Sequence, residues 1–417
     1  MNAEIIAVGS EMLTPERVDT NSLYLTRQLN NLGVEVVAKG VVGDDREFLA
    51  AAIRVALERC SIVILTGGLG PTEDDVTREA VATALGRGLS LSPEVLRALE
   101  RRFDLAKRTM AENNRRQALV VDGAEALPNT RGTAPGQWVR EGSAALLLLP
   151  GPPHEMQAMF ELEGLPRLQR LVPPVAIRTV VLRVIGIGES DLDLAIAPVY
   201  KRYANPVTSV LAANGEIQVW LRASCASLEE ADRLLAEVAA PIGSILGDKI
   251  YSRENQPLEA VVGGLLRAAG ATVAVAESCT GGMLGERFTS VPGSSDYFAG
   301  GFIVYTEAAK RELLGVNPET LARFGAVSAE TAGEMALGAR RRCGATYALA
   351  ITGVAGPAPS SAPDGSEIPA GSVYMALAGP AGTRAAHRVF LSDRQRVRTI
   401  AAQFALDLLR RELLGLI

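Results

Sequence analysis

The residue types best suited to chemistry in this chain lie in one short turn, residues 276–282, with the sequence Ala-Glu-Ser-Cys-Thr-Gly-Gly. The turn follows an expected strand that ends near Val275 and precedes an expected helix that starts near Met283. A serine on such a turn is exposed beside free helix N–H groups, which can hold an oxyanion or a phosphate. We expect Ser278 to act there, although serine and threonine are also frequent helix caps. The neighbours expected to approach a ligand closely are Thr280, Gly281 and Gly282.

Polar residues follow other expected strands of the same C-terminal part. Residues 301–310 end one strand and place a tyrosine and one of only five lysines after it. Residues 351–357 end another strand in a second glycine-rich loop, and residues 392–394 open the last helix. Because the ends of parallel strands can converge on one edge of a sheet, we expect these side chains to share a site with the serine. The residues so placed are Tyr305, Lys310, Thr352, Gly353 and Arg394.

A serine becomes a nucleophile only when a base takes its proton, and this chain has few bases. Of its two histidines, His154 lies in another domain and His387 lies in an alternating run typical of a strand. A Ser-His-Asp triad is therefore disfavoured, which leaves a Ser-Lys pair, a variant of the same logic. Lys310 then needs a pKa lowered by burial or by a nearby cation such as Arg394. This chemistry favours acyl transfer or amide hydrolysis on a small anionic substrate.

Cys279 is the rival nucleophile, because it directly follows the serine. A free cysteine often behaves instead as a small buried hydrophobe. We favour that interpretation and keep the cysteine as the alternative nucleophile.

A further glycine-rich loop, residues 66–77, follows a buried strand near the N-terminus and opens a helix. Its glycines can cradle an anionic group, and Asp74 and Asp75 could ligate a divalent cation that bridges phosphates. Asp75 and Thr77 could equally cap the helix, and for Thr77 we favour the cap. Acidic residues also follow the neighbouring strands, namely Glu11, Asp19, Asp44 and Asp45.

The elements that position these loops alternate between short apolar runs and amphipathic helical stretches. Near the N-terminus the expected strands are 5–8, 34–41, 62–65 and 145–149, with helices at 21–32, 46–59 and 76–85. After residue 255 the expected strands are 272–275, 301–305, 347–351 and 372–377, with a last helix from residue 394. Such alternation predicts βαβ units and parallel sheets.

Between these two parts lies a small module with an alternating strand at 216–222 and an amphipathic helix at 228–238. We predict an α/β fold: two α/β domains with mainly parallel sheets, joined by a small α+β module that is KH-like in its elements. The predicted domains are residues 1–168, 169–252 and 255–417. A connector role is favoured for the module, because no G-x-x-G loop with flanking basic residues occurs in it.

Composition and charge narrow the class of protein. The formal net charge of −5 and the sequence pI of about 5.5 argue against a general nucleic-acid or anionic-membrane binder. The four cysteines show no C-x-x-C spacing, which disfavours a zinc knuckle or a redox pair. The N-terminal residues are typical of a first strand rather than a signal peptide, and no apolar run is long enough to span a bilayer. We expect a cytoplasmic protein with neither nucleic-acid nor membrane partners.

The whole chain resembles the CinA family (competence/damage-inducible protein A). The resemblance is carried by residues 276–282, 301–310, 351–357 and 371–374. It implies that the C-terminal domain is a nicotinamide mononucleotide (NMN) deamidase, an amidase that forms nicotinate mononucleotide and ammonia without a cofactor. It gives Ser278 the role of nucleophile and Lys310 that of its base. Tyr305 and Thr352 would support the site, and Arg394 would contact the substrate or tune the lysine.

The N-terminal half resembles the molybdopterin-binding fold, which in CinA relatives is linked to metal-dependent ADP-ribose pyrophosphatase activity. Cleavage of a diphosphate needs a metal to offset charge and a positioned water. We predict a divalent metal (Mg, Mn or Co) near Glu11, Asp44 and Asp75. Arg183, in the linker module, is a predicted phosphate contact. The residues predicted to contact the nucleotide are Thr66, Gly67, Gly68 and Gly70.

The leading hypothesis is thus a homodimeric, bifunctional nucleotide hydrolase with NMN and ADP-ribose as its small-molecule partners. Two features depart from the family pattern. Residues 212–214 lack an expected basic residue, which weakens the pyrophosphatase prediction, and the long Pro/Ser-rich loop after Pro357 changes access to the deamidase site. Two alternatives stay open: an N-terminal half that only binds a pterin or nucleotide, and a regulatory scaffold in competence or the DNA-damage response.

Overall fold

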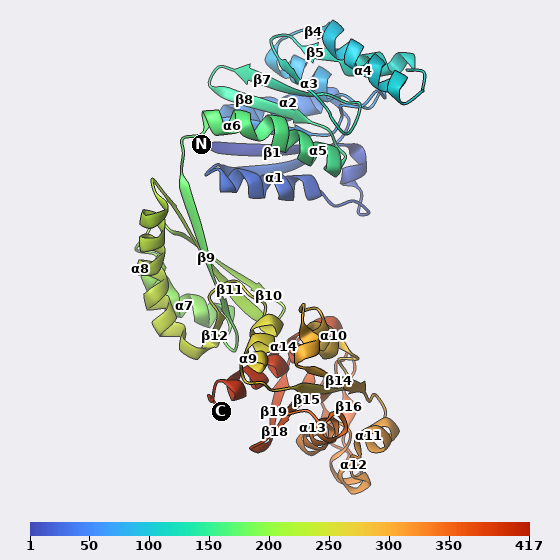
Figure 1. Ribbon diagram of the computed structural model, residues 1–417, viewed down its shortest axis with the longest axis vertical. Coiled ribbons are helices and arrows are strands. Elements are labelled where there is room, and N and C mark those ends of the chain that lie inside the picture. The colour runs from blue at the N-terminus through green and yellow to red at the C-terminus, as the bar shows by residue number, and fades with distance from the viewer. The chain divides into compact units, whose positions relative to one another are not determined.

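The computed structural model describes residues Met1 to Ile417, and the chain forms two compact units (Figure 1). The first unit contains residues 1–177 and 224–231, and the second contains residues 178–223 and 232–417. None of the helices is both long and apolar enough to pass through a bilayer.

The first unit is an α/β domain around a six-stranded, mainly parallel sheet. Its strands are β1 (Asn2–Val8), β2 (Glu35–Val42), β3 (Ile62–Thr66), β6 (Glu125–Leu127), β7 (Gly136–Glu141) and β8 (Ala144–Leu149). They lie in the order β2-β1-β3-β8-β7-β6. The first three pairs are parallel, and the β8–β7 and β7–β6 pairs are antiparallel. Every residue of β3 and β8 is buried, as expected for strands that are covered on both faces.

Helices cover both faces of this sheet (Figure 1). They are α1 (Thr20–Asn31), α2 (Arg46–Arg59), α3 (Thr77–Leu85), α5 (Pro153–Met159) and α6 (Leu165–Leu171), whereas α4 (Pro93–Leu105) lies outside these two layers. Helices α2 and α3 bury Leu49 and Val81 in one core, and α1 and α5 bury Leu29 and Met156 in the other. The helices cover the two faces of the sheet, so the loops that follow the carboxyl ends of β1, β3 and β8 remain uncovered at its edge.

An excursion after α3 is absent from our sequence analysis. It contains α4 and a two-stranded antiparallel sheet of β4 (Leu89–Leu91) and β5 (Leu119–Val121). The edge strand β6 and its neighbour β7 are also absent from the predicted strands. Strands β4, β5 and β6 have three residues each, which is too short for an alternating pattern to stand out in a sequence.

The second unit includes most of the small α+β module, while residues 224–231 of the module belong to the first unit. Its strands are β9 (Ala176–Val184), β10 (Val207–Ala213), β11 (Glu216–Cys225) and β12 (Ile250–Ser252), and its helices are α7 (Glu189–Tyr200) and α8 (Leu228–Leu246). The strand order is β10-β11-β9-β12. Along β11 the side chains of Ile217, Val219 and Leu221 are buried and alternate with less buried ones, which is the alternation that the sequence predicts.

The rest of the second unit is built on a five-stranded sheet. Its strands are β13 (Val273–Glu277), β14 (Phe298–Ile303), β15 (Tyr347–Gly353), β18 (Ser372–Gly379) and β19 (Gly382–Val389). They lie in the order β14-β13-β15-β18-β19, with the first three parallel and the last two antiparallel. A separate hairpin, β16 (Ser360–Ser361) with β17 (Glu367–Ile368), occupies the Pro/Ser-rich loop.

The two faces of this sheet differ in side-chain size. On one face Val275, Leu349 and Met375 pack under α9 (Leu258–Ala268), α10 (Met283–Thr289) and α14 (Arg394–Leu413). On the other face Ala274 and Ala350 pack under α11 (Glu307–Leu314), α12 (Pro318–Phe324) and α13 (Ala329–Cys343). The parallel strands β14, β13 and β15 therefore end at one edge, between two layers of helices (Figure 1).

Strand β14 ends two residues earlier than the predicted strand 301–305, at Ile303. The next residue, Val304, donates its N–H to the carbonyl of Glu277 at 2.8 Å. Thr306 then caps α11, because its hydroxyl accepts a hydrogen bond from the N–H of Ala309 at 3.1 Å. Lys310 consequently lies in the helix that follows the strand.

Candidate active site

Ser278 and Lys310 meet at the carboxyl edge of the C-terminal sheet. Ser278 directly follows β13, and Lys310 lies in the first turn of α11. The Nζ atom of Lys310 is 3.1 Å from the Oγ atom of Ser278. Ser278 is 7% exposed and Lys310 is 1% exposed. A hydroxyl and an amine at this separation are within proton-transfer reach of each other.

The lysine amine has two further partners, the carbonyl oxygens of Val304 at 2.9 Å and of Tyr305 at 3.4 Å. Burial lowers the pKa of Lys310, and the charges of Cys279 and Glu307 offset this only in part. A neutral amine can donate its two N–H groups to the two carbonyls. Its lone pair is then left for the Ser278 hydroxyl, which is the arrangement that a general base requires.

A cavity of about 360 Å³ opens beside the pair. This volume lies in the range of small-molecule sites. The cavity is lined by Ser278, Cys279, Tyr305, Lys310, residues 326–327 and 352–358, Ser360 and Arg394. The structure thus gathers the residues that the strand-end argument placed together, namely Ser278, Tyr305, Lys310, Thr352, Gly353 and Arg394.

Three of these residues shape the wall of the cavity. The Tyr305 side chain is exposed, while its backbone carbonyl holds the lysine. Thr352 donates its hydroxyl to the carbonyl of Ala326 at 2.7 Å and so braces the wall. Arg394 donates one N–H to the carbonyl of Gly356 at 2.8 Å. Besides the lysine, Arg394 is the only cationic side chain that lines the cavity.

Cys279 is a buried thiol at the wall of the cavity. Its residue is 6% exposed, and burial raises its pKa to about 11, although Lys310 and Arg394 act in the opposite direction. Because the thiolate is the reactive form, such a thiol is inert near neutral pH. This environment favours the serine.

The start of α10 is not open to a ligand, contrary to our expectation. The Glu277 carboxylate accepts hydrogen bonds from the N–H groups of Gly282, Leu284 and Gly285, at 3.1, 3.0 and 2.8 Å. Glu277 is 1% exposed, so an internal anion occupies the positive end of the helix. The three predicted backbone contacts, Thr280, Gly281 and Gly282, do not line the cavity. The signal that could have warned of this is the glutamate directly before the serine.

In the first unit, Asp75 builds the glycine-rich loop. Its carboxylate accepts hydrogen bonds from the N–H groups of Gly70 at 2.7 Å and Thr72 at 2.9 Å, and also from the Thr72 hydroxyl. Asp44 accepts a backbone N–H bond at 2.8 Å, and Glu11 is exposed. No group of three or more His, Cys, Asp or Glu side chains is placed to hold a metal ion. The expected set of Glu11, Asp44 and Asp75 therefore does not fit a metal site, and we derive no step through a metal.

We expect the substitution Asp75→Ala to lower the free energy of unfolding of the first unit by about 1–3 kcal/mol, because two loop N–H groups lose a charged acceptor. Denaturant titration measures this loss. Asp74→Ala is the matched control, since the Asp74 side chain is exposed. Equal losses in the two variants would contradict the structural role of Asp75.

The same loop is tied to α3 by Thr77 and Arg78. The Thr77 hydroxyl donates to the carbonyl of Gly67 at 2.8 Å, whereas the helix is capped by Val76 without a side-chain bond. Our interpretation of Thr77 as the cap is therefore wrong. Arg78 is fully buried and donates to the carbonyls of Leu69 and Gly70 at 2.7 and 2.8 Å. The loop that includes the predicted contacts Thr66, Gly67, Gly68 and Gly70 is fixed by these bonds.

Two polar residues near this loop, Asn21 and Ser22, are not among the site residues predicted from the sequence. The Oδ1 atom of Asn21 and the Oγ atom of Ser22 are buried without a partner in the chain. Asn21 donates its Nδ2 to the carbonyl of Gly151 at 2.8 Å, and Gly151 lies against Gly67. The sequence does indicate where these two residues lie, because both follow closely after Asp19, the N-cap of α1. Unpartnered buried atoms of this kind mark the candidate ligand edge of the first unit.

Arg183 is not placed to contact a phosphate, as we had predicted. Its guanidinium donates to Glu216 at 2.8 Å and to the Oδ1 atom of Asn255 at 2.8 Å. Both partners belong to the second unit, so the arginine serves the structure of that unit.

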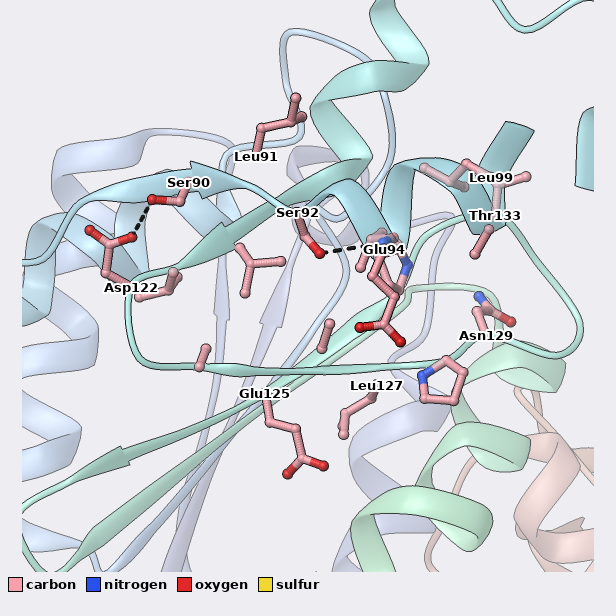
Figure 2. Close-up of a pocket in the computed structure, with 18 of the residues that line it drawn as sticks. Ser90, Leu91, Ser92, Glu94, Leu99, Asp122, Glu125, Leu127, Asn129 and Thr133 are labelled. Atoms are coloured by element: carbon pink, nitrogen blue, oxygen red, sulfur yellow. Dashed lines mark hydrogen bonds between the residues drawn. The ribbon is translucent and has the colours of Figure 1, made fainter. Parts of the chain in front are cut away.

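A larger cavity of about 760 Å³ lies in the excursion of the first unit, between α4, the β4–β5 sheet and residues 122–129. Figure 2 shows the hydrogen bond between Ser90 and Asp122 at one end of it. At the other end Arg102 donates to the carbonyl of Asn129 at 3.1 Å. None of the site residues predicted from the sequence lines this cavity.

Three family models match consecutive parts of the chain. Residues 4–170 match the model described as "Probable molybdopterin binding domain". Residues 179–252 match "Damage-inducible protein CinA KH domain", and residues 255–413 match "CinA C-terminal domain".

Individual relatives extend this result over the full length. A CinA-like protein of Solibacter usitatus (strain Ellin6076) is 64% identical over 415 residues, which cover 100% of this chain and 99% of that protein. A CinA-like protein of Acidobacterium capsulatum is 47% identical over 418 residues, 99% of this chain and 100% of that protein. Among solved structures, competence damage-inducible protein A from Klebsiella pneumoniae is 35% identical in sequence. The match covers 37% of this chain and 94% of that protein's chain, with a TM-score of 0.36. On the identity and coverage of the full-length relatives, the chain belongs to the CinA family.

Proposed function

We propose that the C-terminal domain is an amidohydrolase that deamidates NMN to nicotinate mononucleotide and ammonia. The observation that carries this proposal is the pair of Ser278 and Lys310, 3.1 Å apart and buried at the wall of a small cavity. A serine beside a neutral lysine is a nucleophile with its base, suited to an amide. The resemblance of the site motifs to the CinA family supplies the choice of substrate.

In this proposal Ser278 attacks the carboxamide carbon while Lys310 takes the hydroxyl proton. The lysine then returns that proton to the amide nitrogen, and ammonia leaves an acyl-enzyme behind. A water molecule, deprotonated by the same amine, then attacks the acyl-enzyme. The bond to the Oγ atom of Ser278 breaks, and the lysine returns the proton of the water to that oxygen. The serine hydroxyl and the neutral amine are thereby restored, so the protons balance.

The N–H of Cys279 is the candidate donor to the oxyanion. It follows the nucleophile directly and forms no bond to another backbone group. The N–H of Ser278 is not available, because it donates to the carbonyl of Ile351 at 2.9 Å. The residue after the nucleophile supplies such a donor in other serine hydrolases as well.

Two exposed side chains suit the two ends of a mononucleotide. Arg394 can pair with the phosphate, since a guanidinium matches the geometry of phosphate oxygens. Tyr305 is 64% exposed and offers a ring against which an aromatic base can stack. Both line the cavity that contains the nucleophile.

The test of the proposal is product analysis with the full chain. We expect NMN to yield ammonia and nicotinate mononucleotide in equal amounts, with and without a metal chelator. Absence of both products at high enzyme concentration would contradict the proposed function.

The pH dependence is a further prediction. Lys310 can accept a proton only when it is neutral, so kcat/KM should rise with pH and level off above the pKa of the lysine. Burial lowers this pKa, so the midpoint should lie below the value of about 10.4 that is ordinary for lysine. Initial rates between pH 6 and 11 measure it. A rate that falls as the pH rises through this range would contradict the role of the lysine as base.

The ADP-ribose pyrophosphatase activity of the N-terminal domain stays a prediction without a metal site to support it. Incubation of the full chain with ADP-ribose, with Mg²⁺, Mn²⁺ or Co²⁺ and with a chelator, tests it. Release of AMP that depends on the metal would support the hydrolase. Binding of ADP-ribose without cleavage would favour the alternative of a nucleotide-binding module.

A further inference from the structure

We propose that Arg398 is a positioning residue that holds the Ser278 loop in its reactive geometry; the proposal rests on the deamidase function and concerns the same site. Arg398 lies in the second turn of α14. Its Nε donates to the carbonyl of Cys279 at 3.1 Å, and a terminal N–H donates to the carbonyl of Thr280 at 2.8 Å. These are the two carbonyls that directly follow the nucleophile.

Other hydrogen bonds also hold the loop. The N–H of Met283 donates to the carbonyl of Thr280 at 3.4 Å, and the N–H of Gly282 donates to Glu277 at 3.1 Å. The N–H of Ser278 donates to Ile351, and the N–H of Gly281 donates back to the carbonyl of Ser278 at 3.2 Å. The carbonyl of Cys279 has no donor other than Arg398. Because a peptide unit is planar, a bond to this carbonyl also fixes the direction of the Thr280 N–H in the same plane. The Cys279 N–H lies in the preceding peptide plane, which shares only the Cα atom of Cys279 with this one. Arg398 therefore restrains rotation about that Cα atom and acts on the Ser278–Cys279 peptide indirectly.

The helix from which Arg398 projects is itself held firmly. Within α14, Val397 and Ala401, which flank Arg398, are buried in the core under the sheet. Farther along the helix, Gln403 donates to Glu216 at 3.1 Å, and Arg410 donates to the carbonyl of Asp248 at 2.9 Å. Because the helix is fixed in this way, the Arg398 guanidinium has a defined position, and so do the loop carbonyls that it binds.

Helix α14 therefore contributes twice to the site. Arg394 lines the cavity, and Arg398, one helical turn later, fixes the nucleophile loop. The Gln395 side chain braces the guanidinium by accepting an N–H at 3.1 Å. Arg398 itself does not line the cavity, so it acts on the reaction through the loop and not through the substrate.

Three variants test this role: Arg398→Met, Arg398→Lys and Arg396→Met. Methionine has a side chain of similar length without hydrogen-bond donors. Lysine keeps the positive charge but cannot donate to two carbonyls in the fixed geometry of a guanidinium. Arg396 is exposed on the same helix and serves as the matched control. We expect Arg398→Met to lower kcat about 10- to 100-fold with little change in KM, because a small misplacement of reacting groups has effects of this size. Arg398→Lys should recover part of the loss, and Arg396→Met should equal the wild type.

A second readout does not depend on NMN. The rate at which phenylmethanesulfonyl fluoride labels Ser278, followed by mass spectrometry, reports the reactivity of the serine itself. It should fall in parallel with kcat in Arg398→Met. If the wild type releases no ammonia, the proposed function fails, and the labelling rates alone decide the role of Arg398.

Two results would overturn the proposal. One is an Arg398→Met variant whose kcat and labelling rate both stay within about twofold of the control, since a misplaced nucleophile should cost far more than twofold. The other is a raised KM with an unchanged kcat, which would make Arg398 a substrate contact. If the methionine variant does not fold, the lysine variant decides by the same two readouts.

Discussion

Replacement of Ser278 by alanine is expected to abolish ammonia release from NMN. The variant removes the only hydroxyl within 3.1 Å of the Lys310 amine, so no acyl-enzyme can form. Loss of a serine nucleophile lowers kcat by about 10⁴-fold or more in hydrolases whose residues act as a unit. Steady-state ammonia release measures the loss. The melting temperature should change little, because alanine fits the same turn.

Cys279→Ala is the matched control for this prediction. The thiol is buried and its pKa is raised to about 11, so its removal should leave most of the activity. An active Ser278→Ala variant together with an inactive Cys279→Ala variant would transfer the role of nucleophile to the cysteine.

The meeting of Ser278 and Lys310 could be predicted because it follows from topology. Each residue comes after a strand of one sheet, and parallel strands β13 and β14 end at the same edge. The scarcity of histidine then left the lysine as the base. The strand periodicity was strong enough for this inference even though β14 ends at Ile303, before the predicted end.

The partners of the acidic residues could not be predicted in the same way. A carboxylate beside a turn can bind a metal, a substrate group or the N–H groups of its own loop, and the choice depends on distances of a few tenths of an ångström. Asp75 bonds its own loop, and Glu277 caps α10 at the position expected for a substrate anion. Sequence spacing places such residues near a site, but backbone geometry decides which atoms they contact.

Replacement of Lys310 by methionine is expected to lower kcat by about 10²- to 10⁴-fold, the contribution of a positioned general base. Methionine has a similar length and can fill the buried space without the cost of burying an amine. The variant should therefore fold, although the carbonyls of Val304 and Tyr305 lose a donor. Ammonia release and the Ser278 labelling rate measure the effect, and both should fall together.

The variant Lys310→Arg separates two explanations of that loss. If the lysine acts through its lone pair, arginine cannot replace it, because a guanidinium keeps its proton at every accessible pH. The arginine variant should then be as inactive as the methionine variant, and its residual rate should not rise with pH. If the lysine instead acts as a fixed cation that stabilises the oxyanion, arginine should restore part of the rate at neutral pH. The lowered pKa of the buried amine, held by two carbonyls and facing the serine, leads us to expect the first result.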